Sequence, residues 1–413
     1  MKTISADAAV GKIPDGGTMV VPGGCANPVG FYQAFSRNVD RFKDLKIYSG
    51  LSLGGYEFLE RGLGFNFRYN TWQAGSAVRK LMQQDGEEEI GFIPLRLGEL
   101  IKVVGNQNPI KIDTVLIQTS YPQNDGTVSL GISVGATPHF LSQAKQVIAE
   151  FNSNMPVTGG DSKVALGKID FATESDLPLA TYDTGKCDEA EAKIVDHVLS
   201  LIPEGATVQL GIGSVPDKVL SRLDEIGDSE LYSGMLSSGL KNYLAKTINS
   251  KKVSTGELAG TIELYDYVHE NPRICMRGID KTHDVRSLAE ISKFVSINST
   301  IEIDLHGQCN GETVNGVQFS GVGGSLDYIE AAAMSEGGVS IMALPSTTRS
   351  ATKSRIVKAI DPPNVVTTPR YCVDYVVTEY GTTCLKGKTL AERARALTEI
   401  AHPKFREFLS NGV

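Results

Sequence analysis

The chain has 413 residues, of which 41% are hydrophobic and 21% are charged, and this balance excludes a disordered or fibrous protein. At about 100–200 residues per domain, the length indicates two or three domains. The net charge is −8 at pH 7 and no block of lysines and arginines stands out, which argues against a nucleic-acid-binding protein.

Targeting and metal-binding patterns are missing from the sequence. No apolar run approaches the roughly 18 residues of a spanning helix, and the first residues lack the apolar core of a signal peptide. We therefore expect a cytoplasmic protein with no membrane contact. The six cysteines form no CxxC pair and the six histidines no HExxH motif, so neither a disulfide framework nor a metal site is expected.

An internal repeat predicts the architecture. Residues 13–24 read IPDGGTMVVPGG and residues 202–213 read IPEGATVQLGIG. Each copy predicts a short buried strand, a glycine turn and then a helix, which is the βα unit of an open parallel sheet. A weaker sequence similarity relates the predicted strands 113–118 and 293–298.

We therefore expect two homologous open-sheet α/β domains, 1–185 and 186–413. A helix should begin at the acidic residues 188–191 and run to about 201, because carboxylates stabilise a helix N-terminus. Further strands are predicted at 339–344 and 376–377, and the helix formers at 390–397 predict another helix.

Two loops favour binding of an anionic ligand. The loop 319–328 contains Gly321, Gly323 and Gly324, whose backbone N–H groups can approach an anion closely. It matches neither a phosphate-binding Walker loop nor the dinucleotide fingerprint, and a plain strand–helix turn is the alternative interpretation. The hydroxyl-rich loop 344–355 carries three cations, which suit a phosphate, although a solvated loop would have the same composition.

The chain resembles the acetyl-CoA hydrolase/transferase family, most closely its 4-hydroxybutyrate CoA-transferase branch. The resemblance is collinear over nearly the whole sequence. It rests on six segments: residues 155–161 (MPVTGGD), 209–213 (QLGIG), 297–304 (INSTIEID), 319–324 (FSGVGG), 343–347 (ALPST) and 377–381 (VTEYG).

The resemblance implies a CoA-transferase-like fold of the NagB/RpiA type, with an acyl-CoA substrate in the cleft between the two domains. The C-terminal domain would carry most of the CoA site, with Gly324 in the oxyanion loop and Gly321, Gly323, Ser325 and Lys353 near CoA. The expected partners are acyl-CoA and a small carboxylate or acyl acceptor. We also expect a homodimer or homotetramer.

The sequence departs from the family where the family places its nucleophile. A glutamate in a segment such as IHTEMFSDG normally attacks the acyl-CoA, and a glutamyl thioester follows. Here the aligned segment 231–239 reads LYSGMLSSG and puts Gly234 at the position of that glutamate. A glycine has no side chain that could form a covalent intermediate.

Two more substitutions accompany this loss. By alignment, His283 stands where the family has an asparagine that helps to hold the thioester oxygen, and Glu257 replaces a bulky apolar residue. An imidazole with an ordinary pKa of about 6.5 suits proton transfer, and a poorly solvated carboxyl would have a raised pKa. The alternatives are a surface histidine and a glutamate that points outward or pairs with a lysine such as Lys251. Cys25, in the first glycine loop, is a further candidate, although a cysteine is often only a small apolar residue.

These residues predict an enzyme that acts on a CoA thioester without a glutamyl-CoA intermediate. His283 and Glu257 would move protons, Gly324 would steady the oxyanion, and Cys25 is a possible third member of the site. Hydrolysis, decarboxylation and condensation of the acyl group all remain open, as does a conventional acyl-CoA:carboxylate transfer. The alternative from another class is an acyl-CoA-binding pseudoenzyme without activity.

Overall fold

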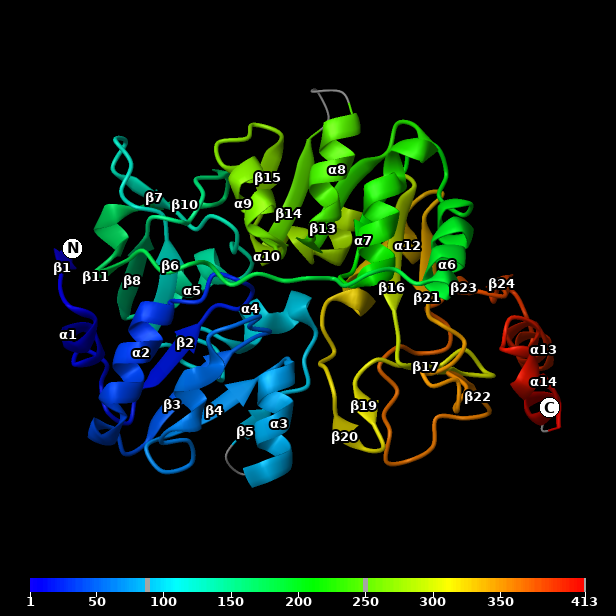
Figure 1. Cartoon of the computed structure of the whole chain (residues 1–413), viewed down its shortest axis with the longest axis horizontal. Helices are drawn as coiled ribbons and strands as arrows, with labels where there is room; N and C mark the ends of the chain where they lie inside the picture. The colour runs from blue at the N-terminus through cyan, green and yellow to red at the C-terminus, as the bar shows by residue number, and fades with distance from the viewer. Residues whose placement is uncertain (86–89, 248–251, 412–413) are drawn as a thin grey trace. The chain divides into compact units, whose positions relative to one another are not determined.

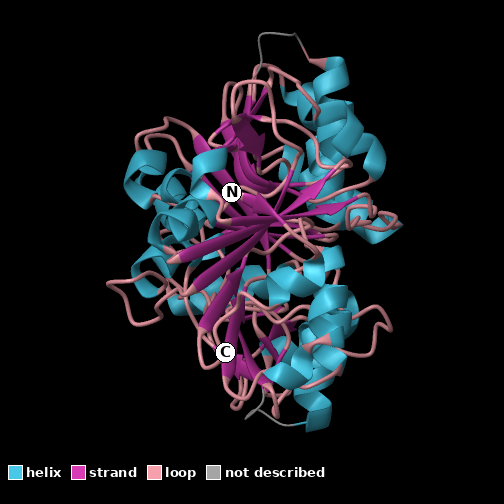
Figure 2. Ribbon diagram, turned by 90° about the vertical axis from the view of Figure 1, so that its left-hand side faces the viewer, coloured by secondary structure: helices cyan, strands magenta, loops and turns pink. Residues whose placement is uncertain are grey.

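The computed structural model describes residues 1–85, 90–247 and 252–411 (Figure 1). The chain forms two compact units, Met1–Asp183 with Lys252–Thr282, and Thr184–Lys251 with His283–Val413. Both units are α/β, as the repeat predicts, and Figure 2 shows strands running between layers of helices.

The contacts of residues 252–282 group them with the N-terminal unit, whereas the sequence analysis placed them in the domain 186–413, and that domain boundary stays a prediction. Strand β15 (Ile274–Met276) pairs in parallel with β14 (Val253–Leu258) and with β9 (Gly159–Gly160), which belongs to the first part of the chain.

The N-terminal unit is built on an eight-stranded sheet in the order β1-β11-β8-β6-β2-β3-β4-β5, in which every pairing is parallel. All six residues of β6 are buried, as expected for a parallel sheet covered on both faces. The strands are β1 Lys2–Thr3, β2 Thr18–Val21, β3 Leu45–Ser49, β4 Phe67–Thr71, β5 Ile90–Phe92, β6 Thr114–Thr119, β8 Gln146–Asn152 and β11 Phe171–Ser175.

Helices and short strands complete this unit. The helices are α1 Ala6–Val10, α2 Val29–Arg37, α3 Ser76–Asp85, α4 Leu100–Val103, α5 Thr137–Gln143, α9 Ile262–Val268 and α10 Ile279–Thr282, with 3-10 turns at Val39–Arg41, Tyr56–Glu60, Leu97–Glu99 and Leu166–Lys168. A two-stranded antiparallel sheet joins β7 (Thr127–Ser129) to β10 (Lys163–Ala165).

The C-terminal unit contains the strands β24-β23-β21-β16-β12-β13 in that order, parallel except for the edge strand β24. They are β12 Thr207–Leu210, β13 Glu230–Leu236, β16 Phe294–Ser299, β21 Val339–Ala343, β23 Tyr375–Thr378 and β24 Gly381–Cys384. The strands predicted in this half are therefore confirmed, with ends that shift by one or two residues.

The helices of this unit are α6 Glu189–Leu199, α7 Ser214–Arg222, α8 Gly239–Lys246, α11 Val285–Ala289, α12 Ser325–Met334, α13 Leu390–Glu399 and α14 Pro403–Ser410, with a 3-10 turn at Leu223–Ile226. Two small sheets follow β16. They are β18-β17-β22 (Cys309–Asn310, Glu302–Asp304, Ile356–Val357) and the hairpin β19-β20 (Thr313–Val314, Val317–Gln318).

Helix α6 begins where its acidic residues predicted. The side chain of Asp188 accepts a hydrogen bond from the backbone N–H of Glu191 at 2.9 Å, and the side chain of Glu191 accepts one from Asp188 at 3.1 Å. This reciprocal capping box satisfies two N–H groups that the first helical turn leaves free.

The helices of the described residues are too short or too polar to cross a membrane.

Candidate active site

The connections of the C-terminal sheet define where a ligand is expected. From β12 the chain crosses through α7 to β13 at one side, and from β16 it crosses through α12 to β21 at the other side. Since parallel crossovers are right-handed, α7 and α12 cover opposite faces of this sheet. The connections from the neighbouring strands β12 and β16 therefore run in opposite directions. In such sheets, ligands bind at the carboxyl ends of the two strands where this reversal occurs.

The space beside Gly234 is filled by the ring of His283 and the hydroxyl of Tyr328. A Cβ atom built on Gly234, in β13, would lie 2.6 Å from the Oη atom of Tyr328 and 2.7 Å from the Cε1 atom of His283. The two rings also contact each other, with centroids 4.9 Å apart. A carboxylate side chain at residue 234 therefore has no room while His283 and Tyr328 keep these positions.

Gly324 packs closely against the same imidazole on its other side. It is the N-cap residue of α12, and a Cβ atom on it would collide with the Nε2 atom of His283 and lie 2.5 Å from its Cδ2 atom. The imidazole of His283 is thus packed between the α-carbons of Gly234 and Gly324. The predicted oxyanion-loop residue and the residue that replaces the family's asparagine lie in contact.

Local structure places His283 at this point. His283 follows α10, and the carboxylate of Asp284 accepts a hydrogen bond from the N–H of Ser287 at 3.2 Å, which caps α11. Leu288 of α11 belongs to the same apolar cluster as Tyr328 of α12. His283 therefore lies directly before the capped helix α11, which packs against α12.

Burial gives His283 a property that the sequence does not show. The residue is 8% exposed, and this burial lowers the pKa of His283 to about 3. The imidazole is neutral at pH 7 and is a weak base. The expectation of an ordinary histidine pKa near 6.5 is wrong, because desolvation disfavours the charged form. The alternative of a surface histidine is also wrong.

Glu257 is the second candidate, and it lies in the N-terminal unit. Its Oε2 atom is buried without a hydrogen-bond partner among the described residues. That atom would be 2.6 Å from a Cβ on Gly24, and its Oε1 atom would collide with a Cβ on Gly135. Burial raises the pKa of Glu257 to about 8, and a hydrogen bond with Ser133 opposes this only in part. The carboxyl therefore packs against two glycine loops and is mostly protonated at pH 7. The raised pKa agrees with the expectation for a poorly solvated position.

Cys25 lies near Glu257 in the same unit, but its thiol is protonated. Burial raises the pKa of Cys25 to about 11, and the charge of Glu257 adds to this effect, while a hydrogen bond with Tyr265 opposes it. Since the thiolate is the nucleophilic form, this environment does not activate Cys25.

The candidates fall into two groups. His283 and Gly324 lie in the C-terminal unit, and Glu257 and Cys25 lie in the N-terminal unit, so the pairing of His283 with Glu257 stays a prediction. Lys251, named as a possible partner of Glu257, lies outside the described residues. Gly321, Gly323 and Ser325 belong to the loop and first turn of α12, and Lys353 is exposed in the loop between β21 and β22. Their contact with CoA stays a prediction.

Two features escaped the sequence analysis. Tyr328 follows Gly324 by four residues, which places both on the same side of the first turn of α12. This helical spacing could have predicted that Tyr328 lies near the glycine loop. Arg349 and Arg355 were noted only as cations of a loop, although the structure places both in a cavity. Among the described residues, no cluster of three or more histidine, cysteine or carboxylate side chains could hold a metal ion.

Comparison with known proteins identifies the family. Residues 1–181 match the acetyl-CoA hydrolase/transferase N-terminal domain, and residues 260–413 match the C-terminal domain of the same family. The chain is 37% identical to a 4-hydroxybutyrate coenzyme A transferase of Clostridium kluyveri, over 99% of this chain and 96% of that protein. The chain therefore belongs to the acetyl-CoA hydrolase/transferase family, which confirms the predicted resemblance.

Solved structures agree with the predicted fold. The crystal structure of RipA from Yersinia pestis matches with a TM-score of 0.93 and 28% identity, covering 100% of this chain and 96% of that one. A 4-hydroxybutyrate CoA-transferase from Porphyromonas gingivalis matches with a TM-score of 0.79 and 33% identity, covering 99% and 96%. The α/β fold of CoA-transferase type is confirmed.

The packing around His283 makes a thermodynamic prediction. Gly234→Ala should lower the free energy of unfolding by about 1–3 kcal/mol, because the new methyl group overlaps the rings of His283 and Tyr328. In a His283→Ala background the same change should cost clearly less, since one of the two rings is gone. Urea denaturation of the four proteins of this double-mutant cycle measures the difference.

Gly211→Ala serves as the control for this cycle, because a Cβ there would meet its nearest neighbours at 3.9 Å, an ordinary contact. Equal costs of Gly234→Ala with and without His283 would contradict the described packing.

The raised pKa of Glu257 predicts a pH dependence of stability. The folded chain keeps this proton up to about pH 8, whereas an unfolded chain loses it near the ordinary value of 4.5. Since the folded state binds more protons between these values, Glu257 makes stability fall as pH rises from about 5 to about 8. Glu257→Gln stays neutral and should lack this fall.

Thermal unfolding at pH 5 and pH 8.5 tests this expectation. The two proteins should differ little at pH 5, and the variant should unfold at the higher temperature at pH 8.5. Parallel pH profiles would show that the carboxyl is solvated.

Proposed function

We propose that this chain is an enzyme that acts on an acyl-CoA thioester, and that its reaction proceeds without a glutamyl-CoA intermediate. Membership in the family, with relatives named as CoA-transferases, supports the substrate class. The imidazole of His283 beside Gly234 is the observation that carries the second half of the proposal. A chain with neither a carboxylate nor room for one at this position cannot form the family's glutamyl thioester there.

In this proposal His283 acts as a neutral hydrogen-bond donor. With its pKa at about 3 it is a poor base at pH 7, but a neutral imidazole still carries one N–H group. We place that N–H and the backbone N–H of Gly324 at the thioester oxygen, where negative charge builds up during attack. Removing one such preorganised donor typically costs about 2.7–4 kcal/mol of transition-state stabilisation.

Glu257 is the proposed proton-transfer group. A pKa of about 8 lies close to the working pH, where proton transfer is most effective. In the simplest case water attacks the carbonyl carbon, the new C–O bond forms and the C–S bond breaks. Glu257 gives its proton to the departing sulfur and regains one from the attacking water. Thus the thioester and water give a carboxylic acid and free CoA.

A trapping experiment tests the absence of the covalent intermediate. The protein is incubated with acetyl-CoA, treated with borohydride and mapped by peptide mass spectrometry. We expect no reduced glutamate, because Gly234 cannot be acylated. A Gly234→Glu/His283→Asn variant is the matched control, since it restores the family's residue types and removes the imidazole from the space. A reduced glutamate in the unmodified protein would contradict the proposed mechanism.

Loss of either proposed group should slow turnover. His283→Ala and Glu257→Gln should each lower kcat for a CoA thioester at least about tenfold, equivalent to about 1.4 kcal/mol of barrier. His197→Gln, on the partly exposed side of α6, is the control for a histidine outside the site. Rates equal to the unmodified enzyme in both site variants would show that the chemistry lies elsewhere. Binding of acetyl-CoA with no turnover of any thioester would favour a non-catalytic binder.

A further inference from the structure

The sheet of the N-terminal unit also has a place where its connections reverse direction. From β2 the chain crosses through α2 to β3, and from β6, the neighbour of β2 on the other side, it crosses through α5 to β8. The carboxyl ends of two such strands border the main crevice of an open parallel sheet. Helix α2 starts there, and its N-cap residue, Pro28, makes no capping hydrogen bond through its side chain. Since a helix N-terminus attracts negative charge, an anion is expected beside the start of α2.

The chain places a carboxyl group of its own in this crevice. Glu150, in β8, is only 1% exposed. Its Oε2 atom accepts a hydrogen bond from the backbone N–H of Phe31 at 2.6 Å, and the backbone N–H of Gly30 donates to the same side chain. Its Oε1 atom accepts a third hydrogen bond from the Nε2 atom of Gln118 at 3.1 Å. Three N–H donors thus surround one carboxyl group at the first turn of α2.

The sequence of α2 leaves room for this carboxyl group. A Cβ atom on Gly30 would lie 2.8 Å from the Oε2 atom of Glu150, so a larger residue at this position would push the carboxyl group away. Burial raises the pKa of Glu150, and the three hydrogen bonds oppose that rise. Because N–H donors favour the charged form of a carboxyl group, this arrangement suits a carboxylate better than a neutral acid.

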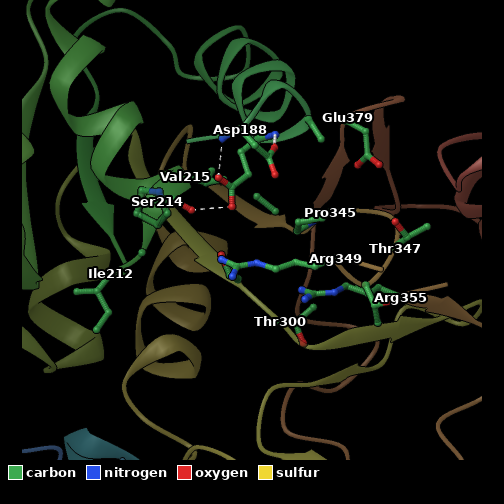
Figure 3. Close-up of a pocket in the computed structure, with 17 residues that line it drawn as sticks. Asp188, Ile212, Ser214, Val215, Thr300, Pro345, Thr347, Arg349, Arg355 and Glu379 are labelled. Atoms are coloured by element: carbon green, nitrogen blue, oxygen red, sulfur yellow. Dashed lines mark hydrogen bonds between the residues drawn. The ribbon is translucent and has the colours of Figure 1, made fainter. Parts of the chain in front are cut away.

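The C-terminal unit has a different residue at the matching position. The similar segments 113–118 and 293–298 place Gln118 of β6 level with Asn298 of β16. Strand pairing puts Glu150 beside Gln118, and it puts Met342 beside Asn298. Where β8 carries a carboxyl group, β21 therefore carries a thioether. The carboxyl ends of β12 and β16 border an open cavity of about 390 Å³ (Figure 3). The two units thus treat the same topological position differently.

Buried hydrogen bonds link Glu150 to the loop between β2 and α2. The Nε2 atom of Gln118, which donates to Glu150, also donates to the backbone oxygen of Asn27 at 2.9 Å. The side chain of Asn27 donates to the backbone oxygen of Gly24 at 3.1 Å and accepts a hydrogen bond from the hydroxyl of Ser52. Gln118 and Asn27 are only 3% and 2% exposed. Since a buried polar group is costly to leave unpaired, these hydrogen bonds fix the course of the loop.

The other end of this loop covers the carboxyl group of Glu257. A Cβ atom on Gly24 would lie 2.6 Å from the Oε2 atom of Glu257, so the loop backbone packs directly on that oxygen. The backbone oxygen of Gly23 accepts a hydrogen bond from the hydroxyl of Ser133 at 3.0 Å, and Ser133 is also hydrogen-bonded to Glu257. The position of Gly24 therefore decides how well the chain shields Glu257 from water.

We propose that Glu150 is a positioning residue: as a built-in anion at the first turn of α2, it holds the loop of Gly24 over the carboxyl group of Glu257. The built-in anion takes the place of an anionic ligand that a helix N-terminus in such a crevice attracts. It acts through Gln118 and Asn27 rather than on the substrate. The importance of this position for catalysis rests on the proposed function of Glu257, whereas the anchoring of α2 does not.

Rescue by a small anion tests the built-in anion. Glu150→Ala removes the carboxyl group, leaves space for a formate ion and should unfold at a lower temperature than the unmodified protein. Formate should raise the unfolding temperature of this variant by at least about 2 °C more than that of the unmodified protein, since a ligand that binds only the folded state stabilises it. Formamide, which has a similar shape and no charge, should lack this effect. Glu174→Ala, which removes an exposed carboxyl group of β11, is the control and should respond to formate like the unmodified protein.

Two results would overturn the built-in anion. One is an equal effect of formate and formamide on Glu150→Ala, and the other is an equal effect of formate on the variant and on the unmodified protein. Should Glu150→Ala not fold without an added anion, the yield of refolded protein replaces the unfolding temperature. Refolding with formate and not with formamide supports the proposal, and failure with both contradicts it.

The pH profile of Glu257 separates positioning from mere support of the fold. Glu257→Gln is compared with its parent twice, in the unmodified protein and in Glu150→Ala, by thermal unfolding at pH 5 and pH 8.5. If the loop loosens in Glu150→Ala, water reaches Glu257, its pKa falls towards the ordinary value, and the stability that it loses between these pH values becomes smaller. Formate, an anion at both pH values, should restore the loss. Cys25 and its neighbour Tyr265 are present in all four proteins, so their titration cancels. An unchanged contribution of Glu257 would overturn the positioning role.

Turnover separates a failure of the proposed function from a failure of this inference. Glu150→Ala should lower kcat for a CoA thioester at least about tenfold with little change in KM, because the proton-transfer group is displaced while the binding residues are not. Formate should restore kcat. If no thioester is turned over by any of the proteins, while formate restores the stability and the pH profile, the proposed function fails and the positioning role of Glu150 stands. A kcat of Glu150→Ala equal to that of the unmodified enzyme would contradict the role of Glu150 in catalysis.

Discussion

The site depends on a steric constraint around a single imidazole. His283 packs between the α-carbons of Gly234 and Gly324 and against the ring of Tyr328. A side chain on either glycine would displace the ring, and a larger side chain at 283 would collide with Gly234 of β13 and with the N-cap of α12. These four residues therefore form one packing unit, in which the choice at each position fixes the others. This is the physical reason to interpret Gly234 and His283 as a single change.

Burial sets the electrostatics of both candidates, although they lie in different units. His283 and Glu257 are both buried, and burial shifts their pKa values in opposite directions, so that both are neutral at pH 7. A neutral donor and a protonated carboxyl suit chemistry in which charge appears only in the transition state.

Local patterns in the sequence predicted much of the fold. The two Ile-Pro-acid-Gly segments became β2 and β12 with their following helices, and Asp188 capped α6 as expected, because these features depend on neighbours in sequence. The side-chain environments were harder to predict. The pKa of His283 follows from its burial, and its contact with Tyr328 follows from the packing of α12 beside it. Residues 252–282 carry an ordinary strand–helix–strand pattern, so nothing local shows that they pair with β9 of the N-terminal unit.

That placement has a consequence for how the chain is made. The N-terminal unit is discontinuous in sequence, so the ribosome synthesises residues 184–251 of the other unit before it synthesises β14 and β15. Until residue 282 has left the exit tunnel, β9 lacks its neighbour and the loops of Gly24 and Gly135 lack the carboxyl of Glu257. The N-terminal unit is therefore unable to complete its fold before residues 184–251 of the other unit have been synthesised.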